Sequence, residues 1–117
     1  MVNQVGGTWG EAMKVPGTAA LSQGGTAVLD SVSCGAAGNC SAGGSYFNNS
    51  IGTQAFVVSQ VGGTWRKAIE VPGAAALNRG AQAEISSVSC ASAGSCSAGG
   101  SYTDSSGNRQ AFVVSRS

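Results

Sequence analysis

The residues able to do chemistry are few in this chain, and they do not form a catalytic set. Acidic residues number five among 117 positions, and there is no histidine to act with them as a general base. None of the five recurs at the matching position of an internal repeat described below. The sequence therefore predicts no catalytic residues and no enzymatic activity. The acids are Glu11, Asp30, Glu70, Glu84 and Asp104.

Four cysteines carry a clearer chemical signal. They form two pairs with the same C-x5-C spacing, Cys34 with Cys40 and Cys90 with Cys96. Facing residues of a hairpin bring their Cα atoms within disulfide range, so each pair predicts a disulfide. The alternative is one zinc ion held by all four thiolates, which requires the two loops to meet and uses a spacing wider than zinc sites usually have. Disulfides would place the parent protein in an oxidising compartment, either secreted or on the cell surface.

The cysteine pairs belong to an internal repeat. The chain forms two tandem copies of 56 residues, about 4–59 and 60–115, which align without a gap and are identical at roughly three positions in five. Charges are exchanged between the copies, as where Glu11 corresponds to Lys67. Because an active site duplicated with its fold should keep its charges, we interpret the variable positions as solvated surface.

Composition limits the partners. Charged residues make up 9% of the chain and the net charge is +1, without a basic run, so nucleic acid and anionic membranes are poor partners. No apolar stretch is long enough to span a bilayer. Met1 is followed directly by repeat sequence, so no signal peptide is expected in this chain. Residues 2–5 and 114–117 both align with 58–61, which is expected of an excised or engineered piece of a repeat array.

Each repeat is predicted to contain four short strands joined mostly by hairpin turns. Glycine is frequent, which disfavours helix, and Gly62-Gly63 indicates a tight turn. In the fourth strand, alternation places four side chains on one face, Trp65, Lys67, Ile69 and Val71. Pro72-Gly73 ends it, and 74–80 is predicted to be a loop or one helical turn. The expected strands are 83–90, 96–103, 54–61 and 64–71, with a loop at 91–95 and a turn at 104–108.

The stretch from 58 to 65, VSQVGGTW, resembles the Asp box S-x-D-x-G-x-T-W of bacterial β-propellers of the BNR, sialidase-like kind. Gly62, Thr64 and Trp65 match it, whereas Val58 and Gln60 replace the serine and the aspartate. The SVSC-x5-C-x-AGGSY section also looks like tandem propeller repeats of secreted actinobacterial and related bacterial proteins. The resemblance implies an all-β fold in which each repeat is a four-stranded antiparallel propeller blade, two per chain.

Two blades cannot close a ring by themselves and would each expose an apolar face. With strand four N-terminal and strand three C-terminal, we expect a homo-oligomer in which residues 5–15 of each chain join the sheet ending at 111–115 of a neighbour. A homotrimer gives six blades and a homotetramer eight, provided that the rotation per chain closes the circle. The glycines at 43–44 and 99–100 are expected to let neighbouring blades or strands approach closely.

Two classes of function remain. The first is a structural or interaction scaffold. The second is a lectin-like module that binds carbohydrate by stacking aromatic rings on sugars, as two-repeat lectins that trimerise into six-bladed rings do. An Asp-box tryptophan usually packs into its own blade, and the tyrosines lie near polar turns. The candidate ligand-binding residues are Tyr46, Tyr102, Trp9 and Trp65.

Sialidase chemistry and cofactors are not expected. Sialidase catalysis would need an arginine cluster with a tyrosine and acids, but the arginines have no counterparts in the first repeat. Residues 104–108 could form a calcium loop, yet their counterparts at 48–52 contain no acid, so a simple turn is favoured and no metal site is predicted. The arginines are Arg66, Arg79, Arg109 and Arg116.

Overall fold

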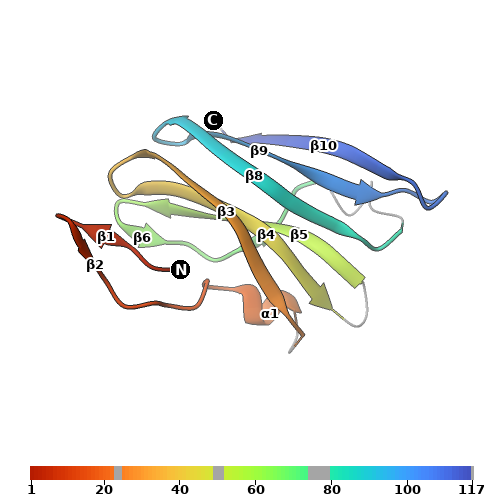
Figure 1. Cartoon of the computed structure of the whole chain (residues 1–117), viewed down its shortest axis with the longest axis horizontal. Coiled ribbons are helices and arrows are strands. Elements are labelled where there is room, and N and C mark those ends of the chain that lie inside the picture. The colour runs from red at the N-terminus through yellow and green to blue at the C-terminus, as the bar shows by residue number, and fades with distance from the viewer. Residues whose placement is uncertain (23–24, 49–51, 74–79, 117) are drawn as a thin grey trace.

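The computed structural model of the chain describes residues 1–22, 25–48, 52–73 and 80–116. These residues form mostly antiparallel β-sheet with one short helix (Figure 1). No helix among them has the length and apolar character needed to cross a bilayer. The predicted loop at 74–80 lies outside the described residues except for Gly80. The matching stretch of the first copy forms the helix α1 (Thr18–Ser22).

The first sheet is a meander in which consecutive strands pair. Its order is β3 (Ala27–Ala36), β4 (Asn39–Asn48) and β5 (Gly52–Val61). Two further two-residue strands, β6 (Thr64–Trp65) and β7 (Ile69–Glu70), both pair with β5. The central strands β4 and β5 are the most buried because both of their faces are covered, which fits their content of alanine, valine and glycine.

The second sheet repeats the first three strands of this meander. It consists of β8 (Ala83–Ser92), β9 (Ser95–Thr103) and β10 (Arg109–Arg116). Its strand pairing matches that of the first sheet position by position, including register shifts at the same two places in β3 and β8. The predicted strands at 83–90, 96–103 and 54–61 are therefore confirmed, each within a slightly longer strand.

The predicted five-residue loop at 91–95 is wrong. β8 continues to Ser92 and β9 starts at Ser95, which leaves Ala93 and Gly94 as the turn. Gly94 has a φ of 77°, which only glycine adopts without strain. The register shift after Cys90 is a bulge that absorbs the extra residue, so the strands stay paired almost to the tip.

The predicted continuous strand at 64–71 is also wrong, because residues 66–68 leave the sheet between β6 and β7. The amide of Ala68 donates its hydrogen bond to the carbonyl of Pro16, at 2.7 Å, and not to β5. This detour ends the predicted alternation. Ile69 is 53% exposed and Val71 is buried, so the two do not share one environment.

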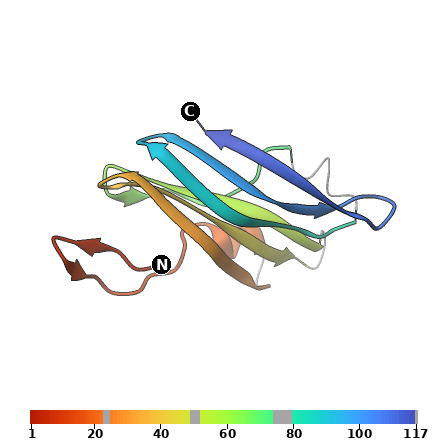
Figure 2. The same cartoon turned by 45° about the horizontal axis from the view of Figure 1, so that its top comes forward.

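The second sheet lies across one face of the first (Figure 2). Ile85 and Val88 of β8 form a shared core with Ala55 of β5 and with Val71, just after β7. The opposite face of the first sheet carries a second core around Phe56, which the N-terminal segment covers. That second core contains Ala42, Tyr46, Phe56, Val58 and Ala68, with Val15, Leu21, Leu29 and Trp65 packed against it.

The N-terminal segment does not form the single strand predicted at 5–15. It forms a hairpin of two short strands, β1 (Gln4–Val5) and β2 (Thr8–Trp9). The hairpin projects from one end of the molecule (Figure 1), and both strands are exposed to solvent.

Candidate functional site

Both predicted disulfides are present. Cys34 pairs with Cys40 and Cys90 with Cys96, with Cα–Cα distances of 3.9 Å and 4.0 Å. Each pair also faces directly across its hairpin. The four-thiolate zinc alternative is therefore wrong. In the described part of the chain there is no free cysteine and no cluster of groups that could hold a metal ion.

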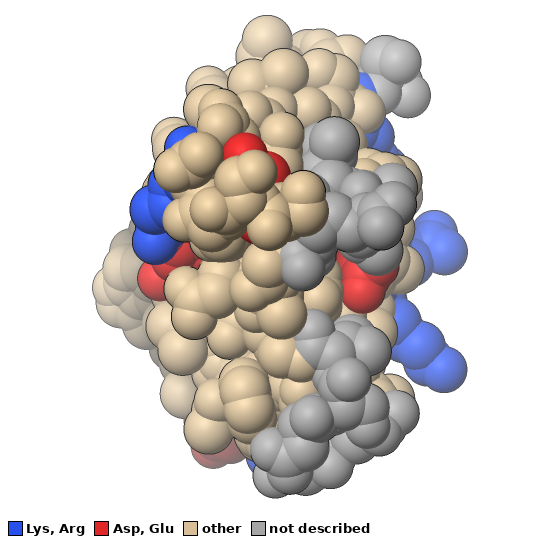
Figure 3. All heavy atoms as spheres, turned by 90° about the vertical axis from the view of Figure 1, so that its right-hand side faces the viewer, with Lys and Arg blue, Asp and Glu red and all other residues tan. Residues whose placement is uncertain are grey.

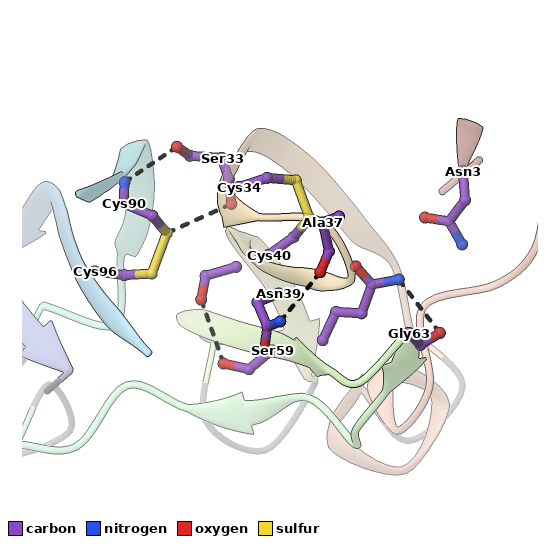
Figure 4. Close-up of a disulfide and its surroundings, with 12 residues drawn as sticks. Asn3, Ser33, Cys34, Ala37, Asn39, Cys40, Ser59, Gly63, Cys90 and Cys96 are labelled. Carbon is purple, nitrogen blue, oxygen red and sulfur yellow. Dashed lines mark hydrogen bonds between the residues drawn. A yellow bond between two sulfur atoms is a disulfide. The ribbon is translucent and has the colours of Figure 1, made fainter. Parts of the chain in front are cut away.

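The two disulfide hairpins lie side by side (Figure 4). The Oγ atom of Ser33 accepts a hydrogen bond from the backbone N–H of Cys90 at 3.1 Å, and Ser31 Oγ accepts one from Val88 at the same distance. The sulfur of Cys90 also lies 3.4 Å from the carbonyl oxygen of Ser33, a contact without a proton because this sulfur is in a disulfide. Serine side chains of β3 thus fix the position of β8.

Tyr46 is a core residue. Its side chain is only 2% exposed, and its ring lies 6.4 Å from that of Phe56, between centroids. Its hydroxyl donates a hydrogen bond to Glu70 Oε2 at 2.8 Å. Burial, the hydrogen bond to Glu70 and the charge of that carboxylate all raise the pKa of Tyr46 well above its usual value. This arrangement ties β4 to β7 and leaves almost no ring surface for a ligand.

The other three aromatic candidates occupy different surroundings. Tyr102 is half-buried against the shared core, with its ring 6.3 Å from that of Phe112. Trp65 is half-buried against the core around Phe56, and its Nε1 donates to Asn3 Oδ1 at 3.2 Å. Trp9 is 64% exposed on β2. Among the described residues, the fold therefore brings no two of these four candidates together as a stacking site.

The charged side chains form no cluster that could hold a metal ion in the described part of the chain. In Figure 3 acidic and basic side chains stand among neutral ones on the face shown. Arg109 bridges to Glu84 at 2.7 Å, with both side chains exposed. The predicted turn at 104–108 is confirmed: Asp104 Oδ1 accepts the backbone N–H groups of Asn108 and Ser106, and these bonds hold the pKa of Asp104 below its usual range. The carboxylate thus organises its own loop.

The four glycines predicted to allow close approach have three kinds of surroundings. At Gly44 and Gly100 a Cβ atom would collide with the backbone of the neighbouring strand, at Val28 and Glu84 respectively. At Gly43 a Cβ atom would lie 2.6 Å from Ile85 Cγ2, so this glycine admits the second sheet. Its counterpart Gly99 has no such neighbour, because a Cβ atom there would meet only a carbonyl oxygen at 3.8 Å.

Grooves border the sheets on two sides in the part of the chain that the structure describes. The first, of about 440 Å³, lies between them and is lined by Val57, Ile69, Val88, Ala98 and Val114, among others. The second, of about 480 Å³, lies on the far side of the first sheet beside the N-terminal segment. On the outer side of the second sheet, Val113 is 84% exposed. The molecule therefore presents apolar surface at both ends of its two-sheet stack.

Comparison with known proteins gives no relative: no family model matches the sequence, and no curated protein and no solved structure matches the chain. What the protein does must therefore be inferred from its own contacts. The contacts of the serines of β3 with β8 are the feature of this region that the sequence did not reveal. Their signal was present as the S-V-S triplet at 31–33, which recurs at 87–89.

Proposed function

We propose that this protein is a non-enzymatic scaffold whose copies assemble head to tail into a closed ring. The outer side of the second sheet in one copy packs on the first sheet of the next copy. Each sheet then serves as one propeller blade, as the Asp-box resemblance implies, and three or four copies give six or eight blades. The two disulfides support an oxidising location outside the cell for the protein.

The contact between β3 and β8 within the chain carries this proposal. Ser31 and Ser33 hold the backbone of β8, and Gly43 admits Ile85. The residues one repeat further along the chain are identical in type and lie on the outer side of the second sheet, where no other sheet of the described chain covers them. These counterparts are Ser87, Ser89 and Gly99.

The first sheet of another copy offers the matching groups. Leu29 is the counterpart of Ile85, and Val32 and Cys34 are the counterparts of Val88 and Cys90. Val32 is 56% exposed, and a groove of about 480 Å³ lies beside Leu29, between the N-terminal segment and the first sheet. In the assembled pair, Leu29 lies on Gly99 of the neighbouring copy. The backbone N–H groups of Val32 and Cys34 donate hydrogen bonds to the Oγ atoms of two serines of that copy, Ser87 and Ser89.

Besides the exchange of Ile85 for Leu29, one difference between the two interfaces affects the hairpin tips. A Cβ atom at Gly35 would collide with the carbonyl of Ser92, so the hairpin tips touch within the chain because residue 35 has no side chain. Its counterpart is Ala91, whose methyl group occupies that space. Between copies, the hairpin tips therefore stand further apart than within one copy.

Light scattering after size exclusion tests the proposal on the full chain. We expect three or four times 11.4 kDa. The double variant Ser87→Lys, Ser89→Lys should reduce the mass to that of a monomer, because two exposed serines become bulky charges at the interface. The matched control Ser105→Lys, Ser106→Lys changes an exposed turn and should leave the mass unchanged. A folded monomer at all concentrations overturns the proposal.

Carbohydrate binding is the second candidate, and the exposed indole of Trp9 is the observation that favours it. A glycan array with the wild-type chain and with Trp9→Ala tests it. Binding that disappears in Trp9→Ala supports a lectin. Absence of binding by the folded, assembled protein removes this candidate.

A further inference from the structure

Residues 1–14 pair with one another in the same way as β5 pairs with β6 and β7 in the first sheet. In that sheet Trp65 pairs with Gln60, and the N–H of Arg66 donates to Ser59. At the N-terminus the same pairing recurs 56 positions earlier, since Trp9 pairs with Gln4 and Gly10 donates to Asn3, at 2.7 Å. The amino group of Met1 donates a hydrogen bond to the carbonyl of Met13, and the N–H of Met13 donates one to the carbonyl of Met1. Their counterparts in the first sheet, Val57 and Ile69, are also paired.

The C-terminal strand carries the same sequence pattern for a third time. Residues 1–5, 57–61 and 113–117 align in sequence. Residues 113–116 of β10 therefore correspond to residues 1–4, which belong to the segment that pairs with residues 8–14. Among the described residues β10 pairs only with β9, which leaves its outer edge open. Residues 1–5 and the end of β10 are therefore alternative partners for one segment, 8–14.

The groove between the sheets has the apolar lining expected for the side chain of Trp9, which belongs to segment 8–14. Trp65 packs against the core that includes Ala42 and Val58. The counterparts of these two residues, Ala98 and Val114, line the groove of about 440 Å³. The counterpart of Trp65 is Trp9, which is 64% exposed. Trp9 and the groove thus correspond to Trp65 and the core on which Trp65 packs. Within one chain, however, the indole of Trp9 does not line this groove.

We propose that residues 8–14 of one copy exchange their partner, leaving residues 1–5 and pairing with β10 of a second copy. Trp9 then lies opposite Arg116, Met13 opposite Val113, and the indole fills the groove between the sheets. This inference rests on the proposed assembly and specifies its contact. Residues 1–5 compete with β10 of the second copy for pairing with residues 8–14. The closed N-terminal hairpin of the free chain therefore weakens assembly.

The turn of that hairpin offers a direct way to shift the competition. Gly7 has a φ of 83°, and a Cβ atom there would touch nothing, so Gly7→Val strains only the backbone of the closed hairpin. Opening the hairpin relieves the strain. We expect the concentration at half-assembly to fall by about tenfold. The matched control is Gly107→Val, since Gly107 has a φ of 85° and equally open surroundings in the 104–108 turn.

Tryptophan emission reports the burial of Trp9. In Trp65→Phe the only remaining indole is Trp9, and its emission should shift to shorter wavelength over the same concentration range in which light scattering detects assembly. If Trp65→Phe does not fold, the difference between the wild-type spectrum and that of Trp9→Phe gives the same signal. Gly7→Val should move both transitions to lower concentration, and Gly107→Val should move neither.

The outcomes separate this inference from the proposed function. Assembly in which Trp9 emission stays constant, or in which Gly7→Val and Gly107→Val behave alike, overturns the exchange but leaves the assembly intact. A monomer at every concentration overturns both. Coincident transitions that Gly7→Val alone displaces support the exchange.

Discussion

Ile85 packs against the bare backbone of Gly43, and this contact sets the distance between the two sheets. A Cβ atom at Gly43 would lie 2.6 Å from Ile85 Cγ2, closer than real contacts permit. Ile85 is fully buried, so it has no room to move aside. The absence of one methyl group thus allows β8 to lie on β4.

The first prediction follows from this contact. Gly43→Ala should lower the free energy of unfolding by about 1–3 kcal/mol, because it overpacks the shared core. Gly99→Ala is the matched control: it places the same methyl at the same position of the second sheet, where it meets only a carbonyl oxygen at 3.8 Å. In the monomer its effect should stay within about 0.5 kcal/mol. Urea unfolding of the two variants measures the difference, and equal effects would contradict the packing described.

The second prediction concerns the tips of the disulfide hairpins. Ala91→Gly removes the methyl that keeps the hairpins of neighbouring copies apart, so it should strengthen assembly severalfold. Gly35→Ala makes the reciprocal change inside the chain and should destabilise it, because the new methyl meets the backbone of Ser92. Sedimentation velocity at several concentrations detects the first effect. Unchanged association of Ala91→Gly would argue against a repeated interface.

The third prediction concerns pH. The pKa of Tyr46 is raised in the folded chain above its unfolded value near 10. The folded state therefore keeps a proton that the unfolded state loses, and the contribution of Tyr46 to stability is complete below pH 10 and declines as the pH rises further. Tyr46→Phe lacks this decline but loses the hydrogen bond to Glu70 at neutral pH. Unfolding curves of both proteins between pH 8 and about 11 test the sign, since parallel profiles would refute it.

The fourth prediction compares the two disulfides. Each closes a loop with a sequence separation of 6, which the chain-entropy model values at about 2 kcal/mol. Replacing Cys90 and Cys96 by alanine should cost more than replacing Cys34 and Cys40, because Cys90 also packs on the shared core and contacts Ser33, whereas Cys34 is exposed. Thermal unfolding of the two double variants gives the comparison. An equal loss would mean that only loop closure matters.

The strands and disulfides could be predicted from the sequence because their signals are local. The paired cysteines, the glycine turns and the recurring apolar residues all lie within one hairpin of each other. The break at 66–68 was not predictable in this way, because it depends on the bond from Ala68 to Pro16, more than fifty residues away. Tertiary contacts overrode the local alternation there.

The candidate site illustrates the same limit. Tyr46 and Tyr102 both follow the sequence Ala-Gly-Gly-Ser, yet Tyr46 is buried and bonded to Glu70, whose counterpart in the first copy is Lys14. Tyr46 lies in the core that the N-terminal segment covers, whereas Tyr102 packs against the core shared by the two sheets. Equivalent residues of the repeat therefore differ in burial because different segments of the chain cover them. Sequence identity between the two copies cannot reveal this difference in burial, because it describes one repeat and not the segments that pack against that repeat.

The nesting of each disulfide within a single hairpin has a consequence for how the protein is made. Four cysteines permit three pairings, and the native one joins the partners nearest along the chain. Short loops close with the least loss of chain entropy, so the correct bonds are also the first to form as each hairpin is synthesised. Oxidation during biogenesis should therefore reach the native pairing directly, without reshuffling by an isomerase, and a longer array of such repeats could mature one hairpin at a time.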